Sequence, residues 1–297
     1  MRARCLALVL ALSPATALAQ DIPPAVITDP APDKQNPATM HVAAIPSHGS
    51  KMNGVLYVAS GAGPHPTLLF LHGLPGNEQN LDLAQAARRA GWNVLTMHYR
   101  GSWGSEGDFS FSHATEDVQA ALAWLRDPAN AASLRIDSAR IAVAGHSMGG
   151  FLAARAGAND PALVGVALIS AWNAGAEAGR SKGSEKDRAL FVEGMAGNME
   201  SLAGCSAQSL AEDAFEHAEE WDFRGYAAKL APRPLLLISS ADGNGPESAA
   251  LAKAARKAGG EAVEEVKMET DHSYSDHRIA LQGALVAWLQ RLASAPR

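Results

Sequence analysis

Short apolar runs alternate along the chain with longer segments in which apolar residues recur at helical spacing. The short runs are bounded by glycine, proline or polar residues and predict strands at residues 41–44, 52–58, 67–71, 94–97, 140–144, 163–169, 234–239 and 262–268. Helical spacing predicts helices at residues 78–90, 114–125, 148–156, 247–258 and 277–292, the second with Thr115 as its N-cap. Strands that alternate with helices indicate a mostly parallel sheet covered on both faces.

One long interval, residues 174–228, interrupts this alternation. It is polar and acidic, it contains no strand-like run, and its apolar residues are spaced as in helices. We therefore expect a helical cap inserted over one edge of the sheet. Insertions at the carboxyl end of a parallel sheet often become lids over a substrate. The sequence leaves open whether this insertion covers a substrate or only buries its own apolar side chains.

The first residues, MRARCLALVLALSPATALAQ, have the three parts of a secretory signal peptide over residues 1–19. Arg2 and Arg4 precede an apolar run at residues 5–12, and residues 17–19 form a small-x-small cleavage site. The apolar run is far shorter than the roughly 20 residues that a membrane span needs. We expect cleavage near Ala19, a periplasmic or secreted protein, and no stable membrane anchor.

The mature chain would begin with a proline-rich segment and contain a single cysteine. Residues 20–38 carry five prolines and no periodicity, which predicts an extended N-terminal segment. Cleavage would remove Cys5 and leave Cys205, so no intramolecular disulfide is expected. Cys205 stands in an alanine-rich stretch with no base nearby in the sequence, which is typical of a small buried residue rather than a nucleophile.

Composition narrows the class of partner. The chain has 297 residues, of which 47% are hydrophobic and 19% charged, so it can bury a sizeable core. Its formal net charge is -6, and it has no run of lysine and arginine. A nucleic-acid surface needs a basic stripe that neutralises phosphates. These features favour a small-molecule partner and no nucleic acid, and they do not determine the oligomeric state.

The stretch AGHSMGG, residues 144–150, places Ser147 between two glycines. A G-x-S-x-G match can arise by chance in a chain with 27 glycines, so its context decides its meaning. A predicted strand ends directly before it and a predicted helix begins directly after it, which is the setting of a nucleophile elbow. Gly145 and Gly149 allow backbones to approach closely at the sharp turn. Ser147 is therefore the predicted nucleophile.

With these motifs the sequence resembles the α/β-hydrolase superfamily from about residue 50 to its end. The resembling motifs are FLHGLPG at 70–76, HYRGSWGSEG at 98–107, GHSMGG at 145–150 and DHS at 271–273. The chain is most similar to bacterial serine esterases and to the dienelactone-hydrolase and prolyl-oligopeptidase-like branches. The resemblance implies an α/β-hydrolase fold with a mostly parallel, doubly wound sheet over residues 39–297, the cap insertion at about 174–228, and catalysis without a cofactor.

A serine hydroxyl needs a general base within hydrogen-bond reach, and a histidine is the usual base. His272 follows the last predicted strand and lies in the loop ETDHSYSDH, which matches the chain order serine, acid, histidine. His277 competes with it, although it is expected to begin the final helix. A metal site of His272, Asp276 and His277 matches no recurrent ligand spacing, so we expect no metal.

The acid that orients the histidine should follow a strand at the carboxyl edge of the sheet. Asp242 follows the run PLLLISS by two residues, as the acid of the resembling superfamily does. An aspartate in ADGNGP also suits a simple Asx-turn, so a structural role is the alternative. Asp271 and Asp276 are the other candidate acids.

Two backbone N–H groups should hold the oxyanion that forms when an ester carbonyl is attacked. One is that of Met148, directly after the nucleophile, and the resemblance implies that the other is that of Leu74. The resemblance also implies that Arg100 braces the oxyanion loop. Trp103 could line the pocket for the acyl or alcohol part of the substrate.

The combined prediction is an exported serine hydrolase that cleaves carboxylic esters of small molecules through Ser147, His272 and Asp242 and an acyl-enzyme intermediate. An amidase or serine peptidase of the same fold is the first alternative, because the same machinery can cleave amides. A non-catalytic binding protein on a hydrolase scaffold is the second, because a fold does not dictate a function.

Overall fold

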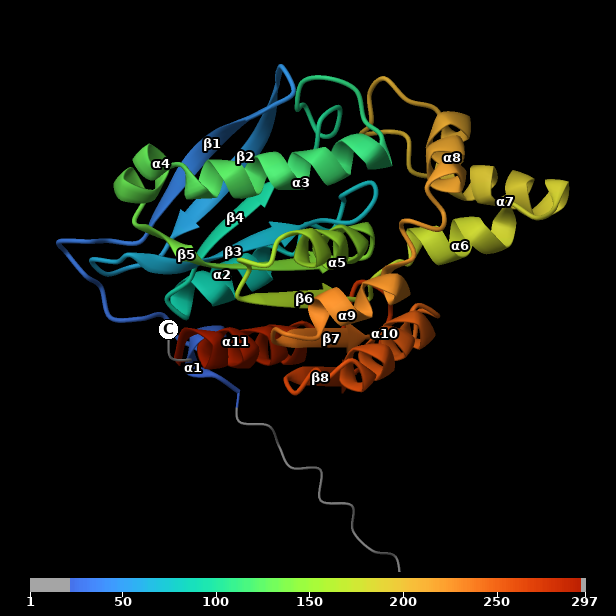
Figure 1. Ribbon diagram of the computed structural model, residues 1–297. Coiled ribbons are helices and arrows are strands. Elements are labelled where there is room, and N and C mark those ends of the chain that lie inside the picture. Colours follow the sequence, from blue (N-terminus) through green and yellow to red (C-terminus); the bar gives the residue numbers. More distant parts are fainter. Residues whose placement is uncertain (1–21, 295–297) are drawn as a thin grey trace, which may run out of the picture.

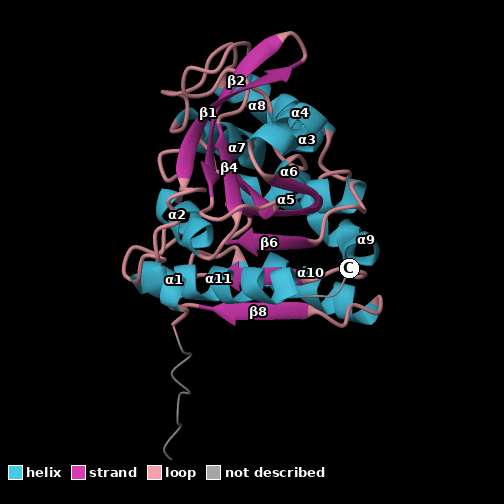
Figure 2. Ribbon diagram, turned by 90° about the vertical axis from the view of Figure 1, so that its left-hand side faces the viewer, coloured by secondary structure: helices cyan, strands magenta, loops and turns pink. Residues whose placement is uncertain are grey.

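Eight strands form one twisted sheet in the order β1-β2-β4-β3-β5-β6-β7-β8 (Figures 1 and 2). The strands are β1 (Thr39–Ser47), β2 (Ser50–Val58), β3 (His65–Leu71), β4 (Asn93–Met97), β5 (Ile136–His146), β6 (Gly165–Ile169), β7 (Leu235–Ser239) and β8 (Val263–Lys267). β2 is antiparallel to both of its neighbours, β1 and β4. All other neighbouring strands in the sheet are parallel to each other. The mostly parallel sheet predicted from the sequence is therefore confirmed.

The computed structural model describes residues 22–294. Its helices are α1 (Pro24–Ile27), α2 (Leu81–Arg89), α3 (Phe111–Arg126), α4 (Pro128–Ser133), α5 (Met148–Asn159), α6 (Ala174–Ser181), α7 (Glu185–Ala196), α8 (Ala207–Glu216), the 3₁₀ turn η1 (Phe223–Tyr226), α9 (Ala227–Leu230), α10 (Gly245–Lys257) and α11 (Arg278–Ser294). The predicted signal peptide lies outside the described residues. Over the described range, no helix has the length and apolar character that crossing a membrane would require.

The central strands are buried on both faces, which explains their continuous apolar runs. In β3, Leu69 and Leu71 face a cluster that includes side chains of α3, α5 and α10, whereas Leu68 and Phe70 face a second cluster with α2 and α11. β5, β6 and β7 alternate in the same way. Burial on both faces fixes the register of these strands, because a slip of one residue would exchange the two clusters.

Several predicted boundaries are displaced by a few residues, and two of the displacements have a clear local cause. The strands predicted at residues 41–44 and 52–58 both extend toward each other and are joined by a two-residue turn, in which His48 and Gly49 adopt positive φ values of 46° and 85°. The N-cap of α3 is Ser110 rather than Thr115, since the Ser110 hydroxyl accepts a hydrogen bond from the His113 amide at 2.9 Å. Local capping chemistry, which the apolar spacing does not report, places both boundaries.

The interval predicted as a cap, residues 174–228, contains α6, α7 and α8, which project from the carboxyl end of the sheet (Figure 1), and then η1 and the start of α9. Its apolar side chains pack on one another and on the domain: the rings of Phe191 and Phe215 lie 5.0 Å apart, and the ring of Trp172, just after β6, lies 6.3 Å from that of Phe191. A backbone bridge also joins Ser102 to Leu202. The cap is therefore attached to the domain through aromatic packing and through backbone pairing.

The described part of the N-terminal segment, residues 22–38, differs from a purely extended chain. It contains the short helix α1, whose carbonyl groups at Ala25 and Val26 accept hydrogen bonds from the Arg89 guanidinium of α2 at 2.6 and 3.2 Å. α1 lies against α2 and α11 (Figure 2). The segment is thus held to the domain by an arginine that sequence periodicity does not connect to it.

Candidate active site

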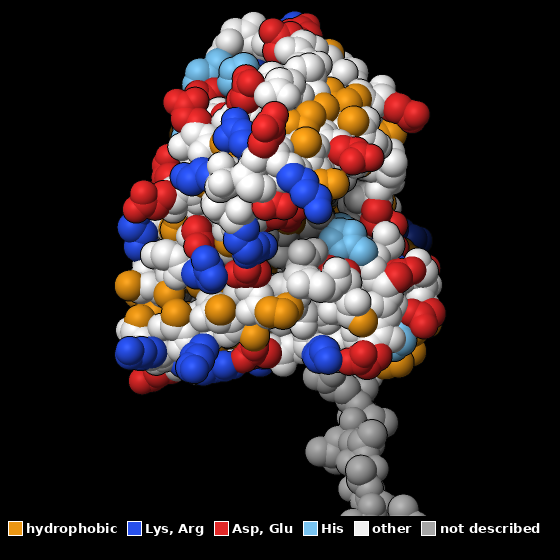
Figure 3. Space-filling model, turned by 90° about the vertical axis from the view of Figure 1, so that its right-hand side faces the viewer, with side chains coloured by type: hydrophobic (Ala, Val, Ile, Leu, Met, Phe, Trp, Pro, Cys, Tyr) orange, Lys and Arg blue, Asp and Glu red, His pale blue; other side chains and the backbone are white. Residues whose placement is uncertain are grey.

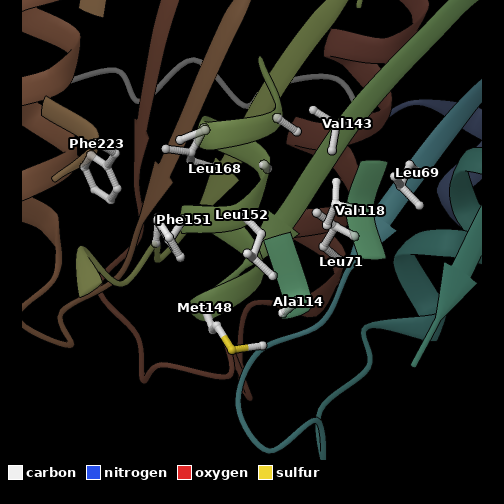
Figure 4. Close-up of a cluster of buried hydrophobic side chains, with 14 of the residues drawn as sticks. Leu69, Leu71, Ala114, Val118, Val143, Met148, Phe151, Leu152, Leu168 and Phe223 are labelled. Carbon is white, nitrogen blue, oxygen red and sulfur yellow. The ribbon is translucent and has the colours of Figure 1, made fainter. Parts of the chain in front are cut away.

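Ser147 lies at the sharp turn between β5 and α5. Its backbone has φ 57° and ψ -119°, a combination that non-glycine residues rarely adopt. The strain is held in place by packing on both sides of the turn. In Figure 4, Met148, Phe151 and Leu152 of α5 point into the core beside Leu71 of β3, and Met148 is 1% exposed. The helix that follows Ser147 is therefore fixed by burial.

The glycines around Ser147 are required by close contacts between backbones. A Cβ atom on Gly145 would lie 1.9 Å from the carbonyl oxygen of Gly149, and one on Gly149 would lie 2.1 Å from that of Leu71. A Cβ on Gly150 would lie 2.5 Å from the Cβ of Ala171. Since no side chain fits at these distances, the spacing G-x-S-x-G-G is a packing requirement of this turn.

The structure brings Asp242 and His272 together. Asp242 follows β7, His272 follows β8, and Nδ1 of His272 lies 2.6 Å from Oδ2 of Asp242. Because the carboxylate accepts, Nδ1 carries the proton and Nε2 is left as the acceptor. The side chain of Asp242 is 6% exposed and that of His272 is 40% exposed. The histidine is thus anchored at one nitrogen and accessible to solvent.

Asp242 is held in its ionised form. Burial opposes ionisation, but the hydrogen bonds from His272 and from the Asn244 amide outweigh burial and lower the pKa of Asp242 to about 2. The Asn244 N–H donates to Oδ1 of Asp242 at 2.9 Å, and the Asn244 side-chain amide donates to Oδ2 at 3.2 Å. The ADGNGP stretch therefore supplies an Asx-turn and a charged partner for His272 at the same time.

The alternative acids face elsewhere. Oδ1 of Asp271 accepts the Ser275 amide at 2.9 Å, and Asp276 accepts the Thr270 hydroxyl and Nδ1 of His277, the latter at 2.8 Å. His277 lies directly before α11, as expected from the sequence. Within residues 22–294, no group of three or more metal-ligating side chains could hold a metal ion.

His146, the residue before Ser147, contacts the loop that carries His272. Its Nε2 donates a hydrogen bond to the His272 carbonyl oxygen at 2.8 Å, and the two rings lie 4.6 Å apart. Burial, followed by the charge of His272, lowers the pKa of His146 to about 4, so the ring is neutral at neutral pH. No hydrogen bond joins Ser147 Oγ to His272 within the described part of the chain. His146 is what links the two loops.

Two further side chains that sequence reasoning did not identify hold the His272 loop. The Tyr274 hydroxyl is fully buried, lies 2.8 Å from the Ser170 hydroxyl, and donates to the Ile238 carbonyl at 3.2 Å. Arg278 donates to the Ser273 carbonyl at 2.8 Å and pairs with Asp82 of α2. Neither residue stands in a recognisable motif, so proximity to His272 in the sequence is the only signal that could have suggested them.

The two predicted oxyanion amides remain available for an external acceptor. Met148 is the first residue of α5, where amides lack partners within the helix, and Leu74 lies in the loop after β3. Neither amide hydrogen bonds to another atom of residues 22–294. The loop also reaches the nucleophile, because a Cβ atom on Gly73 would lie 2.9 Å from the Cβ of Ser147.

Two histidines behind the oxyanion loop were also missed by the sequence analysis. His72 is buried, its Nδ1 donates to the Gly73 carbonyl at 2.7 Å, and its Nε2 lies 3.3 Å from Nδ1 of His98. Burial lowers the pKa of His72 to about 4 and also lowers that of His98. The Tyr99 hydroxyl donates to the His72 carbonyl at 3.0 Å. These neutral side chains support the loop that carries Leu74.

Arg100 braces a different part of the fold from the one expected. Its Nε lies 2.6 Å from Oδ1 of Asp117 in α3, a carboxylate that also accepts the Arg100 amide and the Ser47 hydroxyl of β1. Both members of this ion pair are buried. Arg100 therefore joins α3 to the β1–β2 edge of the sheet, and the histidines and Tyr99 take the supporting role at the oxyanion loop.

Trp103 lies beside the oxyanion loop and is 39% exposed. Its indole N–H donates to the Pro75 carbonyl at 2.7 Å.

Cys205 is half-buried and forms no disulfide, and burial, followed by the charge of Asp108, raises the pKa of its thiol. A raised pKa disfavours the thiolate that a nucleophile needs, which agrees with the structural role predicted for Cys205.

Figure 3 shows the face at the carboxyl ends of the parallel strands, where these loops converge. Acidic and basic side chains are scattered over it, a group of hydrophobic side chains occupies its upper half, and a histidine is exposed near its middle. Ligands of open α/β sheets bind at this end of the strands. The loops that carry Ser147, Asp242 and His272 all leave the sheet there.

Solved structures with similar folds include several hydrolases. The Pyrococcus furiosus esterase is 17% identical with a TM-score of 0.61, and the alignment covers 86% of this chain and 93% of that one. Est1E from Butyrivibrio proteoclasticus, solved with ferulic acid bound, is 17% identical with a TM-score of 0.66 and coverages of 84% and 99%. The 2,6-dihydroxy-pseudo-oxynicotine hydrolase is 16% identical with a TM-score of 0.63 and coverages of 88% and 69%. No curated protein matches the sequence.

A family model provides the assignment that similarity of fold alone cannot. It describes the alpha/beta hydrolase fold and matches residues 70–276, a range that begins in β3, contains the elbow at Ser147 and the cap, and ends after His272. The order of the strands and the position of the elbow agree with that match. The chain belongs to the alpha/beta hydrolase fold family.

Proposed function

We propose that the protein hydrolyses carboxylic esters with Ser147 as nucleophile, His272 as general base and acid, and Asp242 as the residue that orients His272. The observation that carries the proposal is the 2.6 Å hydrogen bond between His272 Nδ1 and the ionised Asp242, on a loop held against the strained Ser147 turn by His146. Asp242 leaves Nε2 of His272 as a free acceptor, and His146 connects the His272 loop to the residue before Ser147. A histidine with a free acceptor nitrogen is the base that activation of a serine hydroxyl requires.

The first half of the reaction forms an acyl-enzyme. The Ser147 hydroxyl oxygen bonds to the ester carbonyl carbon while its proton moves to Nε2 of His272. The carbonyl oxygen becomes an oxyanion, which the free amides of Met148 and Leu74 can bind. When the carbon–oxygen bond to the alcohol breaks, the alcohol oxygen takes the proton from Nε2, and the acyl group remains on Ser147.

Water reverses these steps. His272 takes a proton from a water molecule, whose oxygen bonds to the acyl carbon. The bond to Ser147 then breaks, and the serine oxygen receives the proton from Nε2. One ester and one water thus yield one carboxylic acid and one alcohol, and the enzyme returns to its starting state. His272 needs no cofactor for these transfers, because Asp242 stabilises the imidazolium that forms twice in each cycle.

The decisive experiment combines a covalent probe with turnover of two substrate classes. We expect a fluorophosphonate to label the wild type at Ser147, and Ser147→Ala to lose labelling and to lower kcat for nitrophenyl acetate by roughly 10⁴- to 10⁶-fold. Ser133→Ala is the matched control, since that serine is exposed in α4 and its hydroxyl bonds only to backbone carbonyls of the same helix, and this variant should still be labelled at Ser147. If the wild type resists the probe as completely as Ser147→Ala, the protein is not a serine hydrolase. Turnover of aminoacyl anilides without turnover of esters would replace the esterase by an amidase.

We also propose that the enzyme acts after export from the cytoplasm. The support is the charged, apolar and small-x-small order of residues 1–19. Expression in a Gram-negative host followed by N-terminal sequencing of the periplasmic fraction should give a chain that begins near Gln20. A full-length chain that begins at Met1 and stays in the cytoplasm would refute export and leave the proposed reaction untouched.

A further inference from the structure

A cavity of about 710 Å³ lies between the oxyanion loop, the loop after β4 and the segment that joins α7 to α8. Figure 1 shows this joining segment passing beside the loop between β4 and α3, and a backbone bridge between Ser102 and Leu202 holds the two together. The side chains and backbone that line the cavity include Pro75, Asn77, Trp103, Asn198, Glu200 and Ser201. We call it the Trp103 cavity. Its volume is within the range of small-molecule sites.

The chemistry of the lining selects among ligands. Asn77 offers a side-chain amide that bonds to no other described residue, while Asn198 and Ser201 donate to the Gly194 and Pro75 carbonyls at 2.9 and 3.4 Å and keep lone pairs that can accept from a ligand. Glu200 is the single charged residue of the lining, which contains no lysine or arginine. An anionic ligand would meet a carboxylate and no cation, and a purely apolar ligand would bury the Asn77 amide without a partner. A neutral ligand with many hydroxyl groups satisfies both conditions.

Trp103 adds a rigid aromatic surface to the cavity. Its indole N–H is bound to the Pro75 carbonyl at 2.7 Å, and its backbone N–H donates to the Ser201 carbonyl at 3.1 Å. Its φ of 48° is an unusual conformation for a bulky residue, and such outliers are concentrated at functional sites. The ring centroids of His98 and Trp103 lie 6.1 Å apart, and Trp103 is still 39% exposed. An indole that is fixed at its edge and partly exposed is suited to stacking against the C–H face of a sugar ring.

The Trp103 cavity adjoins the proposed reaction centre through the oxyanion loop. Pro75, which lines the cavity and binds Trp103, follows Leu74, whose amide is proposed to hold the oxyanion. Gly73 in turn lies against Ser147, as the 2.9 Å distance between a Cβ built on Gly73 and the Ser147 Cβ shows. A ligand that contacts Pro75 in the cavity therefore lies against the residue that directly follows Leu74 in the chain.

Trp172 provides an apolar surface, in contrast to the hydrogen-bonding groups of the Trp103 cavity. The Trp172 amide donates to the Ser147 carbonyl at 3.0 Å, and its ring lies 5.5 Å from that of Phe111 and 6.3 Å from that of Phe191 in the cap. Its indole N–H is already bound to Glu177. This aromatic group offers an apolar surface near Ser147, which suits an acyl chain, whereas the Trp103 cavity offers hydrogen-bonding groups.

We propose that the Trp103 cavity binds the alcohol part of the ester and that this alcohol is a sugar or another neutral polyol. The inference rests on the proposed function and specifies its substrate class. In the hydrolysis step the sugar leaves as the alcohol that takes the proton from Nε2 of His272, so the chemistry is the same as for any ester. What changes is the binding energy, since stacking on Trp103 and hydrogen bonds in the cavity act on the sugar alone.

The test keeps the acyl group constant and varies the alcohol. We expect the wild type to hydrolyse methyl glucoside 6-acetate with a kcat/KM at least about tenfold higher than that for ethyl acetate, a factor equal to one good stacking or hydrogen-bonding interaction. Trp103→Ala should reduce the ratio of the two kcat/KM values by about tenfold, mainly through KM for the sugar ester. Trp103→Phe keeps a ring and should retain more of the ratio than Trp103→Ala. Leu190→Ala, an exposed cap residue outside the lining, is the control and should leave the ratio unchanged.

The outcomes separate this inference from the proposed function. Hydrolysis of ethyl acetate by the wild type, with no preference for the sugar acetate or with a preference that survives in Trp103→Ala, overturns the sugar site and leaves the esterase intact. Absence of hydrolysis of both esters, together with resistance of Ser147 to a fluorophosphonate, overturns the proposed function itself. Labelling of Ser147 without hydrolysis of the sugar acetate also overturns the sugar site.

Discussion

The two sides of the active site are built in different ways. On the serine side, position is determined by backbone contacts: Ser147 is held in a strained conformation by Gly145 and Gly149, which leave no space for a Cβ atom. On the histidine side, position is determined by side-chain hydrogen bonds: Asp242, His146 and Tyr274 fix the loop around His272. Added side-chain volume should therefore disturb the serine side, whereas loss of hydrogen bonds or a change of pH should disturb the histidine side.

Asp242→Asn should give the largest effect on the histidine side. An amide in place of the carboxylate cannot stabilise the imidazolium and favours the wrong tautomer of His272, so we expect kcat to fall by about 10⁴-fold with little change in KM. Steady-state kinetics on nitrophenyl acetate measures it. Asp271→Asn is the matched control and should change kcat less than about twofold, because Asp271 only caps a turn. The reverse pattern would identify Asp271 as the acid.

Gly149→Ala should give the largest loss of stability on the serine side. The added Cβ would lie 2.1 Å from the Leu71 carbonyl oxygen in a buried turn, so the backbone must move. We expect the free energy of unfolding to fall by more than about 3 kcal/mol, as for severe overpacking. Urea denaturation followed by circular dichroism measures this change. Gly194→Ala in α7 has open space around it and should raise stability by up to about 1 kcal/mol; equal losses in both variants would refute the steric argument.

Acid should destabilise the protein through its two buried histidines. His72 and His146 titrate near pH 6.5 when unfolded, but burial lowers their pKa values to about 4 in the folded state. Between these pH values the unfolded chain binds more protons. Their contribution to stability is therefore fully present above pH 6.5 and is lost as the pH falls toward 4, by about 3 kcal/mol for each histidine.

The measurement is the free energy of unfolding as a function of pH. His72→Asn removes one titrating group. The free energy of unfolding should then fall less steeply between pH 6.5 and 4, by the slope that corresponds to about one proton bound on unfolding. His41→Gln, which replaces an exposed histidine, should leave the slope unchanged. A wild-type stability that is constant over this range would show that neither buried histidine is protonated on unfolding.

Tyr274→Phe should have the smallest effect of the series. Removal of the hydroxyl leaves the Ser170 hydroxyl and the Ile238 carbonyl with one partner fewer, so we expect a loss of stability of about 1 to 2 kcal/mol. We also expect kcat to fall by up to about tenfold, because the His272 loop becomes less well positioned. Tyr226→Phe removes a comparable bond to the Glu220 carbonyl, away from the site, and should lower stability without lowering kcat. Equal kcat values in both variants would show that the Tyr274 hydroxyl does not help to position His272.

The sequence determined those features that depend on local pattern. Apolar runs predicted the buried parallel strands, because strands covered on both faces bury most of their side chains and so favour apolar ones. The glycines around Ser147 predicted the elbow, because only residues without Cβ atoms permit the backbone approaches found there. The order of Ser147, Asp242 and His272 along the chain allowed the candidate triad to be proposed.

Only the tertiary structure decided which side chains from distant segments meet. In the structure, Arg100 binds Asp117 of α3 and does not brace the loop that carries Leu74. His72 contacts His98, and the Tyr274 hydroxyl binds that of Ser170. The tertiary structure also brought the segment after α7 beside Trp103 and so formed the Trp103 cavity. These contacts join residues far apart in the chain or on separate loops, and they depend on how the sheet aligns its strand ends, which no local pattern of apolar and polar residues records.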